Sequence, residues 1–222
     1  MISKEKIVEL VAVSLSNEAG LRIFENLNLA LCSGETALII GPTGSGKTSL
    51  MELLIGARKP DSGEVILFGR TLNLKNERQI NEIRRRIGGV GGIFDLVPGL
   101  TVADNLVYPL SIRGDALSVQ RAKLKQILTQ FNLLSKKREK ISNLTRGERL
   151  LVMLGRGVIA DQPLLLIDEP LDRLESAAAN ELLGILKRLS VAGHAMIIFT
   201  TGQGAFDFPG VMAFHIKDGR LQ

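Results

Sequence analysis

The sequence predicts an α/β fold with a mainly parallel sheet, and three observations support this. Short apolar runs such as 164–167 and 195–200 are typical of strands buried on both faces of a parallel sheet. Strand-like and helix-like segments alternate along much of the chain. A glycine-rich segment at 41–46 connects one such strand to a helix. We also expect an antiparallel β subdomain at the N-terminus and an inserted helical lobe at about 96–158.

The first third of the chain is predicted to form strands around one helix. Residues 7–13 alternate weakly, and residues 21–31 place an apolar side chain at nearly every second position, as half-exposed strands do. Residues 36–40 form a short apolar run, as a fully buried strand does. The predicted order is strands at 7–13, 21–31 and 36–40, a loop at 41–46, a helix at 47–55, a turn at 60–63 and a strand at 64–68.

The same hydrophobic patterns predict the helices and strands from residue 76 onward. Charged, helix-like sequence at 76–87 is followed by a glycine-rich stretch at 87–99 that predicts a strand and then a loop. From there to the next buried strand no segment has a strand pattern, which is why a separate helical lobe is expected. The predicted elements are helices at 101–110, 118–131, 147–160 and 176–189, and strands at 164–167, 195–200 and 211–216.

Composition limits the classes of protein that need to be considered. The 222 residues are 45% hydrophobic, which suits one domain over residues 1–222. No apolar run approaches the ~20 residues that a membrane-spanning helix needs. The single cysteine, Cys32, excludes an internal disulfide and favours the cytoplasm. The net charge of +5 comes partly from clusters at 84–86 and 136–138. We interpret these as solvated helix faces, with attraction to anionic lipid or an acidic partner as the alternative. Nucleic acid is not expected as a partner, because no recognisable binding module is present.

The segment 41–48 matches the P-loop pattern in full and lies between a predicted strand and a predicted helix. Glycines let successive backbone N–H groups point at one anion, and the helix N-terminus adds partial positive charge. Lys47 would bind the β- and γ-phosphates and Thr48 would ligate Mg²⁺. This motif indicates a P-loop NTPase core. The predicted nucleotide-binding residues are Gly41, Pro42, Thr43, Gly44, Ser45, Gly46, Lys47, Thr48 and Ser49.

Two carboxylates follow the apolar strand at 164–167. Open α/β sheets bind ligands at the carboxyl ends of their strands, so this pair and the P-loop are expected to meet. Asp168 would hold Mg²⁺, and Glu169 would orient or deprotonate the attacking water. The predicted catalytic residues are therefore Glu169 and Lys47, and the predicted metal ligands are Thr48 and Asp168.

Taken together, these motifs resemble the nucleotide-binding domain of ABC transporters, and the resemblance covers essentially the whole chain. The stretches 84–88, 98–102 and 104–106 match sequence around that family's Q-loop. The segment 105–110 looks most like the FtsE, LolD and MlaF-like group. The resemblance implies ATP and Mg²⁺ as cofactors, an integral membrane partner, and a homodimer or a heterodimer with a related ATPase. It also implies a cytoplasmic location at the inner face of the cell membrane.

Several of the family's positions are altered in this chain. The Q-loop glutamine falls at Gly92, and the switch histidine falls at Thr201. The signature sequence corresponds to residues 144–148, with Arg146 where the family has glycine. The D-loop aspartate is Glu175. The aromatic residue that stacks on adenine should lie near residue 17, yet no aromatic precedes Phe24.

These changes leave two functions open. In the first, the chain is an ATPase subunit that hydrolyses ATP, at a rate lowered by the altered positions, to drive a membrane partner. In the second, it is a regulatory or scaffolding subunit in which nucleotide binding, with little or no hydrolysis, changes its association. Losing one transition-state donor typically costs ~10²–10³ in rate, so binding should survive better than turnover. Glu169 favours the first function.

Overall fold

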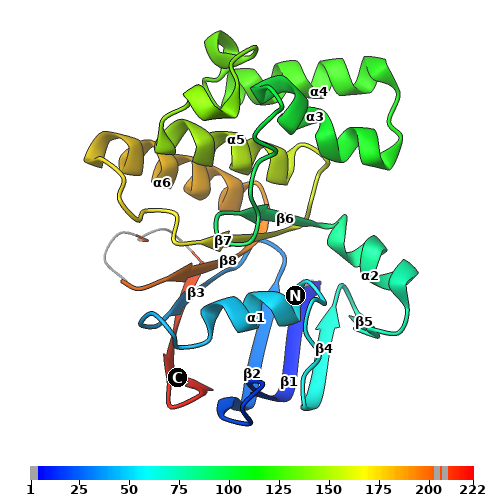
Figure 1. The fold of residues 1–222 in the computed structure, drawn as a ribbon, viewed down its shortest axis with the longest axis vertical. Helices are drawn as coiled ribbons and strands as arrows, with labels where there is room; N and C mark the ends of the chain where they lie inside the picture. The colour runs from blue at the N-terminus through cyan, green and yellow to red at the C-terminus, as the bar shows by residue number, and fades with distance from the viewer. Residues whose placement is uncertain (1–4, 203–205, 207–209) are drawn as a thin grey trace.

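The fold is described from a computed structural model, which covers residues 5–202, 206 and 210–222. It contains two β-sheets, with most helices covering one face of the larger sheet (Figure 1). This larger sheet has six strands in the order β10-β9-β3-β8-β7-β6. Their bounds are β3 Thr36–Ile40, β6 Ile87–Val90, β7 Leu164–Asp168, β8 Ala195–Thr200, β9 Val211–Lys217 and β10 Arg220–Leu221.

The predicted parallel sheet is confirmed. The strand β3 pairs in parallel with β8 and β9, and β7 pairs in parallel with β6 and β8. Only the short β10 runs antiparallel to its neighbour. Every residue of β3 and β8 is buried, which explains why these strands are continuous apolar runs in the sequence.

The N-terminal sheet is antiparallel, with the strand order β2-β1-β4-β5. Along β2 the residues alternate mostly between less and more exposed positions, because one face of this sheet packs on the core. The bounds are β1 Lys6–Ser16, β2 Arg22–Cys32, β4 Ser62–Leu67 and β5 Arg70–Thr71. The predicted N-terminal strands are therefore present: β1 is longer than expected, and the ends of β2 and β4 are shifted by one or two residues.

Helices occupy the positions that the sequence patterns indicate, with ends shifted by a few residues. Within 96–158, the stretch predicted as a helical lobe, α3, α4 and α5 lie together at the top of Figure 1. The bounds are α1 Lys47–Leu54, α2 Glu77–Arg84, α3 Val102–Arg113, α4 Leu117–Gln130, α5 Arg146–Val158 and α6 Ser176–Val191, with 3-10 turns at Leu134–Lys136 and Ile141–Asn143.

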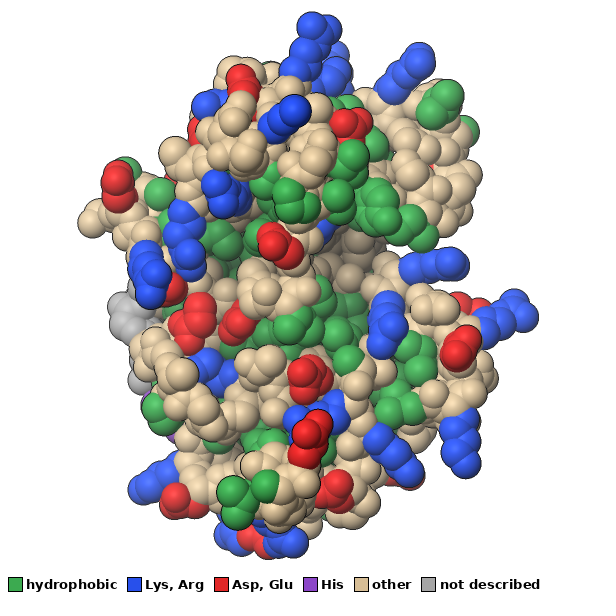
Figure 2. Space-filling model, viewed as in Figure 1, with side chains coloured by type: hydrophobic (Ala, Val, Ile, Leu, Met, Phe, Trp, Pro, Cys, Tyr) green, Lys and Arg blue, Asp and Glu red, His purple; other side chains and the backbone are tan. Residues whose placement is uncertain are grey.

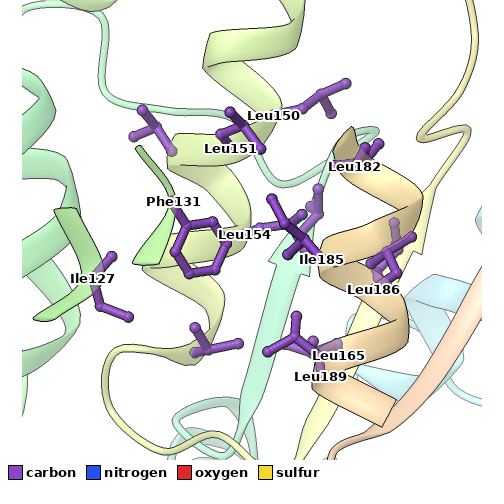
Figure 3. Close-up of a cluster of buried hydrophobic side chains, with 14 of the residues drawn as sticks. Ile127, Phe131, Leu150, Leu151, Leu154, Leu165, Leu182, Ile185, Leu186 and Leu189 are labelled. Atoms are coloured by element: carbon purple, nitrogen blue, oxygen red, sulfur yellow. The ribbon is translucent and has the colours of Figure 1, made fainter. Parts of the chain in front are cut away.

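Two clusters of buried apolar side chains pack on opposite faces of the large sheet. One joins its upper face to α3, α4, α5 and α6. Figure 3 shows Phe131, Leu154 and Ile185 meeting there from separate segments. The other joins the opposite face to α1 and the N-terminal sheet, and it includes the fully buried Phe24. Because β3 and β7 are parallel and held from both sides, their carboxyl ends meet at one edge of the sheet.

The basic cluster at 84–86 is exposed, as predicted, but it also makes specific contacts. Arg84 donates from Nε to the Ile55 carbonyl at 2.8 Å and from Nη2 to the Gly56 carbonyl at 3.1 Å. Cations at a helix C-terminus satisfy its carbonyls and its dipole. The Arg86 guanidinium lies 3.8 Å from the centre of the Phe68 ring. Arg84 thus secures the end of α1 and Arg86 packs on Phe68, roles that the sequence pattern did not indicate.

Candidate functional site

The phosphate-binding loop connects β3 directly to α1. Gly44 and Gly46 have φ of 84° and 101°, in the left-handed region that favours glycine. A Cβ on Gly46 would lie only 2.7 Å from Ile23 and from the Phe24 ring, so packing also requires glycine there. No side chain caps the N-terminus of α1, and no acidic residue lies in its first turn. Its free N–H groups and dipole are therefore available to an anion.

Lys47 extends across the mouth of this loop. Its side chain is 9% exposed, and Nζ donates to the Gly41 carbonyl at 2.6 Å and to the Pro42 carbonyl at 3.3 Å. The same Nζ lies 3.4 Å from Glu169 Oε1. This contact brings the loop and the end of β7 together, as the sequence predicts.

Glu169 has an unusual backbone conformation for a non-glycine residue, with φ of 43°. Its N–H donates to the Phe199 carbonyl at 2.9 Å, which holds this conformation. Its Oε2 accepts a hydrogen bond from the Thr201 backbone N–H at 3.2 Å. The Glu169 carboxylate is thus held between the Lys47 ammonium group and the Thr201 backbone N–H. Backbone strain of this kind occurs where the surrounding structure determines the conformation, often at functional sites.

Asp168 lies at the carboxyl end of β7, beside Glu169. Burial raises the pKa of Asp168, and the charge of Glu169 raises it further, while Lys47 opposes the shift. The raised pKa means that the ionised carboxylate lacks full compensation in the nucleotide-free protein. A divalent cation is the natural partner for such a group.

The phosphate-binding loop and the two carboxylates at the end of β7 line one cavity of about 330 Å³. Its lining residues are Thr43, Gly44, Gly46, Lys47, Thr48, Ser49, Asp168 and Glu169. Ser45 Oγ is buried and makes no hydrogen bond, so it has an unused polar group inside the loop. The tertiary structure therefore brings together the residues predicted from the sequence to bind phosphates and metal.

The donor set fits Mg²⁺. Within the described residues, no cluster of three or more His, Cys, Asp or Glu side chains could hold a metal by itself. Thr48 and Asp168 instead offer a hydroxyl and a carboxylate oxygen in the lining of the same cavity. Mg²⁺ usually takes only one or two protein oxygens and completes its shell with phosphates and water.

The altered positions have distinct environments. Gly92 has no side chain, and its backbone lies against Asp168: an added Cβ would be 3.1 Å from the Asp168 Cβ and Cγ. Thr201 contributes its backbone N–H to Glu169. The Arg146 guanidinium, half exposed, lies 3.3 Å from Asp172 Oδ2. Thr145 and Glu148 form a capping box at the start of α5, so the signature segment begins a well-defined helix.

The turn between β1 and β2, where the adenine-stacking aromatic is expected, contains Asn17. Its Oδ1 accepts from the N–H groups of Ala19 and Leu21. Arg58 joins this region to α1, donating from Nη2 to the Ser16 carbonyl at 2.9 Å. Its Nη1 lies 3.4 Å from Ser49 Oγ. Neither Arg58 nor the Thr201 amide was identified from the sequence, because no local pattern relates them to the loop.

We expect Asp168→Asn to raise the melting temperature of the nucleotide-free protein at pH 8. The folded state binds the Asp168 proton more tightly than the unfolded chain does, so ionisation of Asp168 weakens the fold at high pH. The gain should be about 2–4 °C for each kcal/mol relieved. It should shrink as the pH falls through the raised pKa of the folded state and vanish below about pH 3, where the carboxyl is protonated in both states. Differential scanning fluorimetry across this range measures it, with exposed Asp61→Asn as the control. An equal gain at every pH would contradict the explanation.

Three comparisons with known proteins agree with this geometry. Residues 24–172 match the protein-family model described as "ABC transporter". The chain is 32% identical to the lipoprotein-releasing system ATP-binding protein LolD 1 of Chlorobium chlorochromatii, over 94% of this chain and 86% of that protein. It is 24% identical to the cell division ATP-binding protein FtsE of Bacillus subtilis, over 96% and 93%. The dimeric ATP-binding cassette MJ0796, solved with ADP and Pi, superposes with a TM-score of 0.86 at 27% identity, covering 97% of each chain.

Proposed function

This chain belongs to the ABC transporter family as an ATP-binding subunit, and from that premise we propose that it binds Mg-ATP and hydrolyses it to drive a separate membrane subunit. The observation that carries this proposal is the convergence of Lys47, Asp168 and Glu169 on the cavity beside α1. ATP binding needs the Lys47 cation and the free N–H groups at the start of α1. ATP hydrolysis also needs a carboxylate beside the attacking water. All of these groups line one space.

Separate residues of the site bind the phosphates, hold the metal and activate the water in the proposed reaction. The loop amides and Lys47 bind the β- and γ-phosphates, and Lys47 exchanges the Gly41 carbonyl for phosphate oxygens. Thr48 and Asp168 would hold Mg²⁺, and the bound ion would supply positive charge toward the phosphates. Phosphate binding also separates Lys47 from Glu169. Glu169, still held by the Thr201 amide, is then available to orient a water molecule and accept its proton.

A groove on one face of the molecule supports a membrane partner. It has a volume of about 530 Å³ and lies between α2, β6, α3 and α5. Tyr108 and Ile112 on its wall are 46% and 51% exposed. Figure 2 shows a hollow with hydrophobic side chains between the upper and lower parts of the molecule, with lysine and arginine side chains at its right edge. We propose that a helix of an integral membrane subunit occupies this groove.

Two copies would complete the working unit. The similar cassette MJ0796 is a dimer in its solved structure. For this chain we propose a homodimer, or a heterodimer with a related ATPase, in which the start of α5 in one copy faces the P-loop of the other.

None of the helices in the described ranges is long and apolar enough to cross a membrane. We propose that the membrane subunit holds this single-domain chain at the inner face of the cell membrane.

The regulatory alternative rests on the altered side chains. Gly92 offers no side chain to metal or water, and Thr201 offers only a backbone N–H to Glu169. Neither change removes a phosphate-binding group. A protein with this site would bind Mg-ATP and change its association with a partner while hydrolysing little.

Phosphate release from Mg-ATP by the purified chain distinguishes the two functions. We expect turnover above that of Lys47→Ala, measured beside a direct ATP-binding assay. Turnover equal to the variant, with binding retained in the wild-type chain, would contradict hydrolysis and favour the regulatory function. Equal partner affinity with and without Mg-ATP would contradict the regulatory function.

A further inference from the structure

Another cavity lies beside α1, at the turn between β1 and β2. It has a volume of about 710 Å³, and the residues that line it are Asn17, Glu18, Ala19, Glu52, Ala57 and Arg58. Arg58 connects this cavity to the phosphate-binding loop, because its Nη1 lies 3.4 Å from Oγ of Ser49, which lines the loop cavity. The two cavities are therefore neighbours along α1.

The base of a bound nucleotide must lie outside the loop cavity, because a ribose separates it from the phosphates. A cavity of about 440 Å³ shares Asp168 and Glu169 with the loop cavity, at the end where the metal and the terminal phosphate are proposed to lie. The base is at the other end of a nucleotide from the terminal phosphate. The cavity at Arg58, next to Ser49, is therefore the one that the base can enter.

Arg58 presents a fixed guanidinium group to this cavity. Its Nη2 donates to the Ser16 carbonyl at 2.9 Å, and its Nη1 lies 3.5 Å from Oε2 of Glu52. These contacts use N–H groups that lie in the plane of the guanidinium, so its faces stay available for stacking. The side chain is 27% exposed, which leaves part of it accessible to a ligand.

None of the described residues that line this cavity is aromatic. Phe24, the first aromatic residue of the chain, is fully buried and packs against Gly46. Guanidinium planes stack on nucleic-acid bases as aromatic rings do. Stacking distinguishes poorly between bases, because every base has a π-face. Arg58 is therefore the group in this cavity that can hold a base by its face.

The edge of the base would meet carboxylates. Glu18 and Glu52 line the cavity, and an ionised carboxylate only accepts hydrogen bonds. Adenine offers its N6 amino group as a donor, and guanine offers its N2 amino group. The lining therefore excludes neither purine.

We propose that Arg58 stacks on the base of the bound nucleotide and that the site accepts adenine and guanine nearly equally. This inference rests on the proposed function, in which the loop and Lys47 bind the phosphates. It adds GTP to ATP as a ligand of the chain. It also assigns to Arg58 a contact with the nucleotide in addition to its contacts with Ser16 and Glu52.

The test compares the affinities of Mg-ATP, Mg-GTP and Mg-tripolyphosphate by isothermal titration calorimetry, since tripolyphosphate has the phosphates without a base. We expect GTP to bind within about threefold of ATP. Arg58→Ala should weaken both nucleotides by about fivefold or more and leave tripolyphosphate within about twofold. Arg58→Lys keeps the charge beside Glu52 but has no planar group, so it should weaken the nucleotides nearly as much. Arg78→Ala, which removes an exposed arginine paired with Glu82, is the matched control.

Unchanged ATP affinity in folded Arg58→Ala would overturn the proposal. An equal loss for tripolyphosphate would also overturn it, because Arg58 would then act only by positioning Ser49 and the loop. A preference for ATP over GTP above about tenfold would contradict the equal acceptance of the two purines. If Arg58→Ala does not fold, as judged by its melting transition, Arg58→Lys decides, and full ATP affinity in that variant would exclude stacking. If Lys47→Ala binds all three ligands as the wild-type chain does, the proposed function itself fails, and that outcome is separate from any change in the Arg58 variants.

Discussion

Glu169→Gln should reduce ATP turnover by ~10²–10⁴-fold, the typical contribution of a general base. Glutamine has the same shape and can still accept the Thr201 N–H at the position of Oε2. It cannot take a proton from water, so the loss should appear in kcat. ATP affinity should stay equal or rise, because Glu169 no longer competes with phosphate for Lys47. Single-turnover phosphate release and equilibrium binding measure the two effects separately.

The control for this variant is Glu181→Gln, at an exposed position of α6. It removes one negative charge without touching Lys47. A similar loss of turnover in both variants would indicate a general electrostatic effect. Turnover within threefold of wild type in Glu169→Gln would exclude Glu169 as the base.

Lys47→Ala should weaken ATP binding by about 2–3 kcal/mol, on the order of 100-fold in Kd. The side chain is the only cation lining the cavity formed by the described loop and carboxylate residues. Its removal also leaves Asp168 and Glu169 in this lining without a cation to offset their charge toward the phosphates. Isothermal titration calorimetry with Mg-ATP measures the loss directly.

The exposed Lys59→Ala is the matched control for net charge. Because Lys47 is buried, a melting curve must show that the variant remains folded. Unchanged ATP affinity in folded Lys47→Ala would mean that nucleotide binds elsewhere on the chain. It would contradict both proposed functions, since each depends on this loop.

The two proposed functions predict different results when Glu169→Gln and Lys47→Ala are compared. A working ATPase loses turnover in both Glu169→Gln and Lys47→Ala but loses ATP binding only in the second. A regulatory subunit shows little or no turnover in any form and loses partner control only in Lys47→Ala. The position of Glu169, held by Lys47 and by the Thr201 amide, favours the first pattern.

The sequence by itself determined the P-loop, the buried parallel strands and the carboxylates that follow β7. These features depend on interactions between near neighbours in the chain: the glycines of the loop, the uninterrupted apolar runs, and the placement of polar residues directly after a strand. The parallel order of β3 and β7 then brings Lys47 to Glu169. The division into a single domain with a helical lobe at 96–158 stays a prediction.

Only the tertiary structure decided how the altered positions behave. Gly92 appeared in the sequence to be a lost side chain, yet its backbone contacts Asp168 more closely than any residue with a Cβ could. The hydrogen bond from Arg156 to the Asp95 carbonyl, the amide that Thr201 offers to Glu169, and the pairing of Arg146 with Asp172 join residues from separate elements. No local pattern encodes such contacts, because they arise when distant segments pack on the same edge of the sheet.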